Sequence, residues 1–157
     1  MESLVVYDSK FGNTRKLAEA VADGLRSLGS VRLLGLDKLP PKDLGTVDLL
    51  VVGGPTQLRG MSARTRQFID LLETRSQTRM VAVAFDTRLR RPVAFSGSAA
   101  RMIARKLRRT GIRILGRPES FYVREDRPEL ERGEEERAVA WAKTVAERLT
   151  LSYWCAT

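Results

Sequence analysis

The chain has no histidine and one cysteine, Cys155, among its 157 residues. Catalysis by a Ser-His-Asp or Cys-His arrangement needs an imidazole, and a His/Cys zinc site or an internal disulfide needs more such side chains than this sequence has. Nothing beside Cys155 in the tail "SYWCAT" indicates an activated thiol. Any redox chemistry in this protein would therefore require a bound cofactor.

Long hydrophobic runs are also missing. A membrane span requires roughly 18 uninterrupted apolar residues, whereas the 43% of hydrophobic residues here are interspersed with charged ones. The N-terminal "MESLVVYDSK" lacks the basic segment, long apolar core and small-residue cleavage site of a secretory signal. We therefore expect no membrane span and a cytoplasmic location, and the length predicts a single domain over residues 1–157.

Acidic residues are outnumbered, with 19 against 28 basic ones and a net charge of +9. Such a field attracts phosphates, nucleic acid or acidic proteins, although the preponderance of arginine fits a composition bias of the source genome equally well. Arg101, Arg105, Arg108 and Arg109 form a basic helical face that is typical of a solvated surface. Nucleic acid is not an expected partner, because aromatic interleaving and recognised reading motifs are both missing.

Short runs rich in Val and Leu alternate with segments of helical period. Five strands separated by helices predict right-handed crossovers and a three-layer α/β domain, a doubly wound parallel sheet covered on both faces. Pro118 interrupts the fifth strand, and Gly111 is placed to cap the third helix. The expected strands cover residues 4–7, 31–36, 47–54, 79–85 and 112–123, and the expected helices cover about 14–28, 62–73, 98–110 and 133–149.

Ligands of such sheets bind beyond the carboxyl ends of the strands, which here directs attention to the loops 8–14, 53–61 and 85–97. In the first loop, "DSKFGNT", short polar side chains and Gly12 precede a helix N-terminus, a combination that suits a phosphate. Asn13 or Thr14 would serve equally well as an ordinary N-cap. The spacing fits neither the Walker pattern nor the dinucleotide-binding pattern.

The loop "DSKFGNT", the following "LAEAVADGL", the "GGPT" after the third strand, and the segments "PESFYV" and "GEEERAVAWA" together resemble the flavodoxin family over nearly the entire chain. The resemblance implies the sheet order 2-1-3-4-5, FMN as cofactor, and the first loop as its phosphate loop. The family commonly has hydroxyl residues where this chain has Lys10 and Phe11, so two side-chain donors are replaced. The phosphate-loop residues so implied are Ser9, Lys10, Phe11, Gly12, Asn13 and Thr14.

The second loop, "GGPTQLRGMS", matches the position where flavodoxins cover one face of the isoalloxazine ring of FMN. Many relatives have a tryptophan or another aromatic residue near Gln57 or Leu58. The aromatic contribution missing here, roughly 0.5 to 1.5 kcal/mol beyond area burial, would weaken FMN binding without abolishing it. The residues implied for this loop are Pro55, Thr56, Gln57 and Leu58.

The third loop, "FDTRLRRPVAFSGS", corresponds to the one that contacts the pyrimidine edge through backbone groups, here Phe85, Asp86, Thr87 and Arg88. No tyrosine stands where the second stacking ring is often found, and Phe95 is the candidate substitute. Core packing explains Phe85 and Phe95 as well, and it is the favoured explanation for Phe85. Ser96 and Ser98 are expected to cap the next helix.

Four arginines, Arg59, Arg88, Arg90 and Arg91, lie on loops expected to surround the same mouth, where typical flavodoxins are acidic. Guanidinium groups there would stabilise the anionic reduced flavin and make it less reducing. Each 1.36 kcal/mol of such stabilisation of the anion corresponds to one pKa unit. The same groups could instead receive the phosphates of a reduced nicotinamide dinucleotide, NAD(P)H, or an acidic redox partner protein.

Three functions fit the sequence. The first is an FMN-binding flavodoxin-like electron-transfer protein, which needs no catalytic residues of its own because the flavin carries the chemistry. The second is an NAD(P)H-dependent FMN or quinone reductase of the same fold. The third is a flavodoxin-like protein- or anion-binding module that has lost flavin, because fold alone does not determine function.

Overall fold

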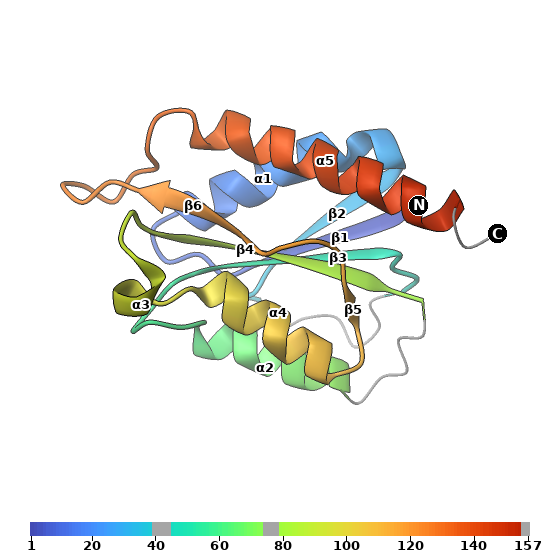
Figure 1. The fold of residues 1–157 in the computed structure, drawn as a ribbon, viewed down its shortest axis with the longest axis horizontal. Helices are drawn as coiled ribbons and strands as arrows, with labels where there is room; N and C mark the ends of the chain where they lie inside the picture. Colours follow the sequence, from blue (N-terminus) through green and yellow to red (C-terminus); the bar gives the residue numbers. More distant parts are fainter. Residues whose placement is uncertain (39–44, 74–78, 155–157) are drawn as a thin grey trace.

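The computed structural model describes residues 1–38, 45–73 and 79–154, so Cys155 lies outside the described residues. Helices α1 and α5 cover one face of a central sheet and α2 and α4 cover the other, which gives three layers (Figure 1). The strands are β1 (Glu2–Tyr7), β2 (Ser30–Gly35), β3 (Leu49–Pro55), β4 (Val81–Leu89), β5 (Arg113–Ile114) and β6 (Glu119–Val123). The helices are α1 (Asn13–Leu25), α2 (Ala63–Glu73), α3 (Val93–Ser96), α4 (Ala99–Arg109) and α5 (Glu134–Trp154), with a 3-10 turn at Arg26–Leu28.

The sheet is parallel throughout and has the order β2-β1-β3-β4-β5, with β6 also paired to β4. β5 pairs with Val81 and Ala82, and β6 pairs with the second half of β4 from Phe85 onward. These two pieces are the predicted interrupted fifth strand, and Pro118 lies between them. The predicted three-layer α/β class and the order 2-1-3-4-5 are confirmed.

Alternate residues of the central strands contribute to two apolar cores. Leu49, Val51 and Val83 belong to the core under α1 and α5, whereas Leu50 and Val52 belong to the core under α2 and α4. Both faces of β3 and β4 are therefore buried, which explains why their apolar residues run continuously and do not alternate with polar ones.

The fourth strand is longer than predicted. The apolar run of the sequence predicts an end at Phe85, but β4 continues to Leu89 because Asp86, Thr87 and Arg88 pair with β6. These three polar residues are buried, and burial by a distant partner strand leaves no local sequence signal. The expected loop 85–97 is therefore the end of a strand followed by the short helix α3.

The helix ends largely follow the predictions. Gly111, with φ of 89°, follows the last turn of α4 as expected of a glycine cap. Ser98 caps the start of α4 by accepting a hydrogen bond from the Arg101 N–H, whereas Ser96 lies within α3 and does not cap α4. α5 opens with three glutamates in its first turn, where the helix dipole favours negative charge.

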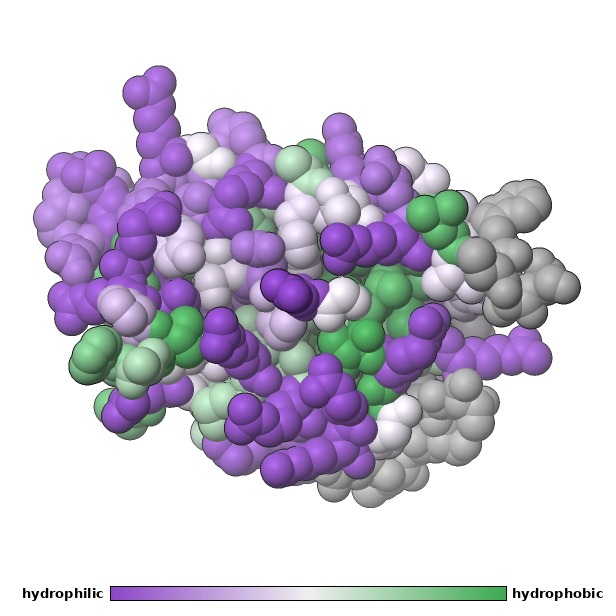
Figure 2. Space-filling view, in the orientation of Figure 1, coloured by the Kyte–Doolittle hydropathy of each residue, from purple (hydrophilic) through white to green (hydrophobic). Residues whose placement is uncertain are grey.

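The surface of the described part is strongly charged. Arg101, Arg105, Arg108 and Arg109 on α4 are all exposed, and hydrophilic side chains gather over the region of α4 and α2 (Figure 2). Within the three described ranges, no helix is long and apolar enough to cross a membrane. The same ranges contain no group of three or more His, Cys, Asp or Glu side chains suited to a metal ion.

Candidate functional site

The carboxyl ends of the strands surround a cavity of about 270 Å³. All three predicted loops contribute to its wall, together with the end of β6 and the segment that follows it. This is the edge toward which β6 points and where α3 lies in Figure 1. The cavity is lined by Ser9, Lys10, Phe11, Asn13, Thr14, Pro55, Thr56, Gln57, Thr87, Arg88, Leu89, Val123 and Pro128.

Gly12 gives the first loop its shape. It is the N-cap residue of α1, with φ of 89° and ψ of −10°, in the left-handed region that favours glycine. The N-cap makes no side-chain hydrogen bond, but Ser9 lies across the loop and its Oγ accepts a hydrogen bond from the Gly12 N–H at 3.1 Å. The alternative that Asn13 or Thr14 is the N-cap is therefore wrong.

Asn13 and Thr14 point away from the helix start and join the loop to other parts of the wall. The Asn13 Nδ2 donates to the Pro128 carbonyl at 3.0 Å, and the hydroxyls of Thr14 and Thr87 lie 3.1 Å apart in a buried hydrogen bond. Because both residues also line the cavity, the first loop is held in place at its inner end while Lys10 and Phe11 remain exposed.

The second loop folds back on itself. Gln57 and Gly60 exchange two backbone hydrogen bonds of 2.8 Å, and the two residues between them, Leu58 and Arg59, have φ values of 44° and 70°. Pro55, Thr56 and Gln57, which the resemblance implies for contact with the flavin ring, line the cavity. Leu58 does not: its side chain is fully exposed and borders a second cavity.

Phe85, which the resemblance places among the cofactor-contacting residues, does not line the cavity. It is completely buried, and its ring centroid lies 6.0 Å from that of Phe121 and 6.1 Å from that of Trp141, both in edge-on arrangements. Its ring therefore belongs to the core under α5, which agrees with the explanation favoured from the sequence.

Asp86 likewise does not line the cavity but holds its wall together. Its buried Oδ2 accepts hydrogen bonds from the Thr56 hydroxyl at 3.1 Å, the Ser98 hydroxyl at 2.6 Å and the Ala100 N–H at 2.9 Å. The carboxylate thus joins the second loop to the first turn of α4. Its Oδ1 is buried and has no hydrogen-bond partner among the described residues.

A second cavity, of about 260 Å³, adjoins the first and shares Thr56, Arg88 and Leu89 with it. Phe95 lies here, with 77% of its surface exposed, and not in the first cavity where a second stacking ring was expected. The full lining is Thr56, Leu58, Arg59, Arg88, Leu89, Arg91, Phe95 and Ser96.

Three of the four arginines predicted to surround the mouth are exposed and occupied by other partners. Arg90 pairs with Glu131 at 2.9 Å, and this hydrogen bond raises the pKa of Arg90. Arg91 pairs with Glu125 at 2.9 Å, and Arg59 donates to the Ala94 carbonyl at 2.7 Å.

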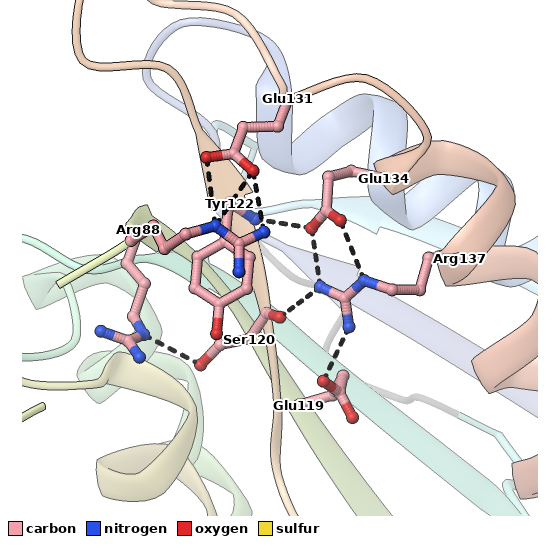
Figure 3. A network of polar contacts seen from close by, with 8 residues as sticks. Arg88, Glu119, Ser120, Tyr122, Glu131, Glu134 and Arg137 are labelled. Carbon is pink, nitrogen blue, oxygen red and sulfur yellow. Dashed lines mark hydrogen bonds and ion pairs between the residues drawn. The ribbon is translucent and has the colours of Figure 1, made fainter. Parts of the chain in front are cut away.

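Arg88 differs from these three. It is 9% exposed, and its Nε donates to the Ser120 hydroxyl at 3.2 Å (Figure 3). Its Nη1 donates to the Ser96 hydroxyl at 2.9 Å and to the Arg91 carbonyl at 2.7 Å. All of these acceptors are neutral oxygens. Arg88 is thus a buried cation in the wall between the two cavities.

An ion-pair network holds β6 beside the site (Figure 3). Arg137 on α5 binds Glu134 and Glu119 at 2.6 and 2.9 Å, and Glu134 also accepts the Tyr122 N–H at 2.7 Å. Burial opposes ionisation of Glu134, but the hydrogen bonds from Arg137 and Tyr122 outweigh it and lower its pKa. The network positions the strand that supplies Val123 to the cavity and Ser120 to Arg88.

Sequence reasoning missed three lining residues, Leu89, Val123 and Pro128. Leu89 and Val123 end the paired strands β4 and β6, so a correct length for β4 would have placed them at the site. Pro128 lies in a charged segment that carries no such signal. Among the residues that the structure describes, no aspartate or glutamate lines either cavity.

Comparisons with known proteins agree with this architecture. A family model described as Flavodoxin matches residues 5–141. A flavodoxin of Aquifex aeolicus is 44% identical over 69 residues, which span 43% of this chain and 37% of that relative. An NAD(P)H dehydrogenase (quinone) of Archaeoglobus fulgidus is 33% identical over 94 residues, 43% of this chain and 49% of the relative. The chain spans less than half the length of each of these curated relatives.

Solved structures show the same fold. A flavodoxin from the domain Archaea superposes with a TM-score of 0.80 at 22% identity, over 96% of this chain and 99% of that one. The rubredoxin oxygen:oxidoreductase of Desulfovibrio gigas superposes with a TM-score of 0.78 at 19% identity, over 96% of this chain but 36% of that one. Because the family model covers most of the sequence and the fold agrees, the chain belongs to the flavodoxin family.

Proposed function

We propose that this flavodoxin-family chain binds FMN in the first cavity and transfers electrons between redox partners. The observation that carries the proposal is the convergence of the first loop, the end of β3 and the end of β4 on one cavity, beside the N-terminus of α1. FMN would supply the redox chemistry, and the protein would bind it, orient it and exclude water.

The first loop offers a suitable set of groups for the phosphate of FMN. Ser9 and Thr14 contribute hydroxyls, Lys10 contributes a positive charge, and the helix N-terminus adds the favourable end of its dipole. The Lys10 Nζ lies 5.3 Å from the centroid of the Phe11 ring, so both side chains extend from the same exposed rim. These groups fit an anion at this end of the cavity.

The opposite end of the cavity fits a planar apolar group without aromatic stacking. Pro55, Leu89 and Val123 present aliphatic surface there, and Gln57 adds an amide. Apolar contacts of this kind bury ring surface but omit the extra stacking energy of an aromatic pair. We therefore propose FMN binding that depends more on the phosphate end than on stacked rings.

A comparison of FMN with riboflavin tests this assignment. We expect the purified apoprotein to turn yellow with FMN and to bind FMN more than tenfold more tightly than riboflavin, which lacks the phosphate. Lys10→Met should reduce this preference, whereas Lys16→Met, an equivalent change at an exposed position of α1 outside the cavity lining, should not. A colourless protein that takes up no FMN would refute the proposed function, and equal affinities would refute the phosphate assignment.

A reductase that uses NAD(P)H is the second candidate. The second cavity favours it, because Arg59, Arg88 and Arg91 line a space directly beside the first and would suit phosphates. The curated name of the Archaeoglobus fulgidus relative also supports it. Anaerobic stopped-flow mixing of the FMN-loaded protein with NADPH or NADH decides between the candidates, since rapid bleaching of the flavin absorbance is expected only of the reductase.

The rim of the two cavities suits an acidic redox partner protein. Three apolar side chains are exposed there: Phe11 at 68%, Phe95 at 77%, and Leu58 completely. Arg59 and Arg91 line the second cavity together with Leu58 and Phe95. Such a surface combines apolar contact with positive charge, so partner association should weaken with added salt.

We further propose a cytoplasmic location. A sequence with one cysteine supports it, because disulfides are common in secreted proteins and rare in cytosolic ones.

A further inference from the structure

Arg88 has three properties that occur together in no other of the four arginines around the site. It lines both cavities, it is buried, and every hydrogen-bond acceptor it meets is a neutral oxygen. Within the described ranges, no carboxylate forms an ion pair with it. A buried charge without a counter-ion is unfavourable, unless a bound ligand brings the opposite charge.

The nearest acidic residue along the strand forms no ion pair with Arg88 among the described residues. Asp86 lies two residues earlier, on the same face of β4, but its Oδ2 contacts Thr56, Ser98 and Ala100, and its Oδ1 has no hydrogen-bond partner there. The other arginines contribute less to the field inside the cavity, because Arg90 and Arg91 are paired with glutamates at the surface. Exposed pairs are also screened by water and salt.

Arg88 stands apart from the phosphate loop. Its guanidinium points toward Ser96 of α3, whereas the neighbouring Thr87 points to Thr14 of the first loop. Lys10 lies on that loop, so its charge would meet the phosphate of FMN, which is negative whether the ring is oxidised or reduced. The charge of Arg88, in contrast, lies in the wall that the first cavity shares with the second.

We propose that Arg88 supplies the positive charge that stabilises the anionic reduced form of bound FMN and so makes it a weaker reductant. The inference rests on the proposed binding of FMN. Reduction by two electrons and one proton leaves one negative charge on the ring system, and the electrons come from the redox partner.

The test measures two quantities for each FMN-loaded variant: the affinity for oxidised FMN and the midpoint potential in a dithionite titration with a reference dye. In Arg88→Gln, we expect affinity for the reduced form to fall about tenfold more than affinity for the oxidised form. For a two-electron couple, this tenfold change lowers the midpoint potential by about 30 mV. Arg88→Lys keeps the positive charge and should retain most of the effect; a tenfold change in its ratio of affinities would overturn the inference even if the glutamine variant does not fold.

Two matched variants separate Arg88 from the overall charge of the protein. Arg91→Gln removes one charge from the surface of the second cavity, and Lys10→Met removes one beside the phosphate loop; each should change the ratio of affinities less than twofold. An unchanged ratio in Arg88→Gln, or an equal change in Arg91→Gln, would overturn the inference. If the wild-type chain takes up no FMN, the proposed function fails first, which distinguishes the two failures.

Discussion

Replacing Gly53 by alanine should destabilise the protein, because the ring of Phe85 occupies the space of the new methyl group. Gly53 and Phe85 are paired in register on β3 and β4. A Cβ on Gly53 would lie 2.1, 2.4 and 2.6 Å from three carbons of that ring. The ring cannot move freely, since Phe121 on β6 and Trp141 on α5 pack edge-on against it.

The size of the effect follows from these distances. Carbon atoms in good contact lie about 3.5 to 4.0 Å apart, so the Phe85 ring would have to retreat by more than about 1 Å. Forcing extra volume into a well-packed core costs about 1 to 3 kcal/mol, and the short contacts place Gly53→Ala near the upper end. For a chain of this length, each kcal/mol lowers the melting temperature by about 2 to 4 °C, so a fall of roughly 6 to 12 °C is expected.

Urea unfolding, followed by far-UV circular dichroism, measures the loss directly. In a Phe85→Leu background, Gly53→Ala should cost at least about 1 kcal/mol less, because the smaller side chain leaves room for the methyl group. Gly54→Ala is the matched control, since its Cβ would lie no closer than 3.2 Å to its nearest neighbour, the Thr65 hydroxyl. A Gly53→Ala variant as stable as the wild type, or equally destabilised in both backgrounds, would refute the explanation.

Two further predictions concern the polar groups around the site. The pKa of Glu134 is lowered in the folded protein, so its ionised form contributes stability above its unfolded pKa of about 4.3, and this stability is lost as the pH falls through the folded pKa. The difference in unfolding free energy between wild type and Glu134→Gln should therefore shrink from pH 7 to pH 3. A difference that stays constant over this range would contradict the prediction. Asp86→Asn should lower the free energy of unfolding by about 1 to 3 kcal/mol in urea, because the acceptor for Thr56, Ser98 and Ala100 loses its charge. An unchanged urea midpoint would contradict the view that Asp86 holds the cavity wall together.

Much of the fold could be predicted from the sequence because its signals are local. Continuous apolar runs such as Leu49–Val52 mark strands buried on both faces, and the helical periods between them imply crossovers. The end of β4 could not be predicted in this way. Asp86, Thr87 and Arg88 have the composition of a loop, and they form a strand only because β6, more than 30 residues later, pairs with them.

The place of the candidate site in the fold could also be predicted from the sequence. The carboxyl ends of parallel strands meet at one edge, so the convergence of the three loops follows from the topology alone. The individual side chains required the structure. Asn13 and Thr14 read equally well as helix caps, but their side chains bond to Pro128 and Thr87. The Phe85 ring is absent from the cavity because it packs against Phe121 and Trp141 in the core under α5.

The arginines show why net charge does not determine the potential of a site. On the sequence, Arg59, Arg88, Arg90 and Arg91 are equivalent positive charges on neighbouring loops. In the structure, Arg90 and Arg91 lie at the surface beside glutamates, where water and salt reduce their field beyond about 10 Å. Arg88 is surrounded by protein, where the effective dielectric constant is far lower and the same charge acts more strongly over the same distance. In a chain with a net charge of +9, we therefore expect one buried side chain to shift the potential of a bound flavin more than any single surface arginine does, and most surface arginines should be replaceable without changing that potential.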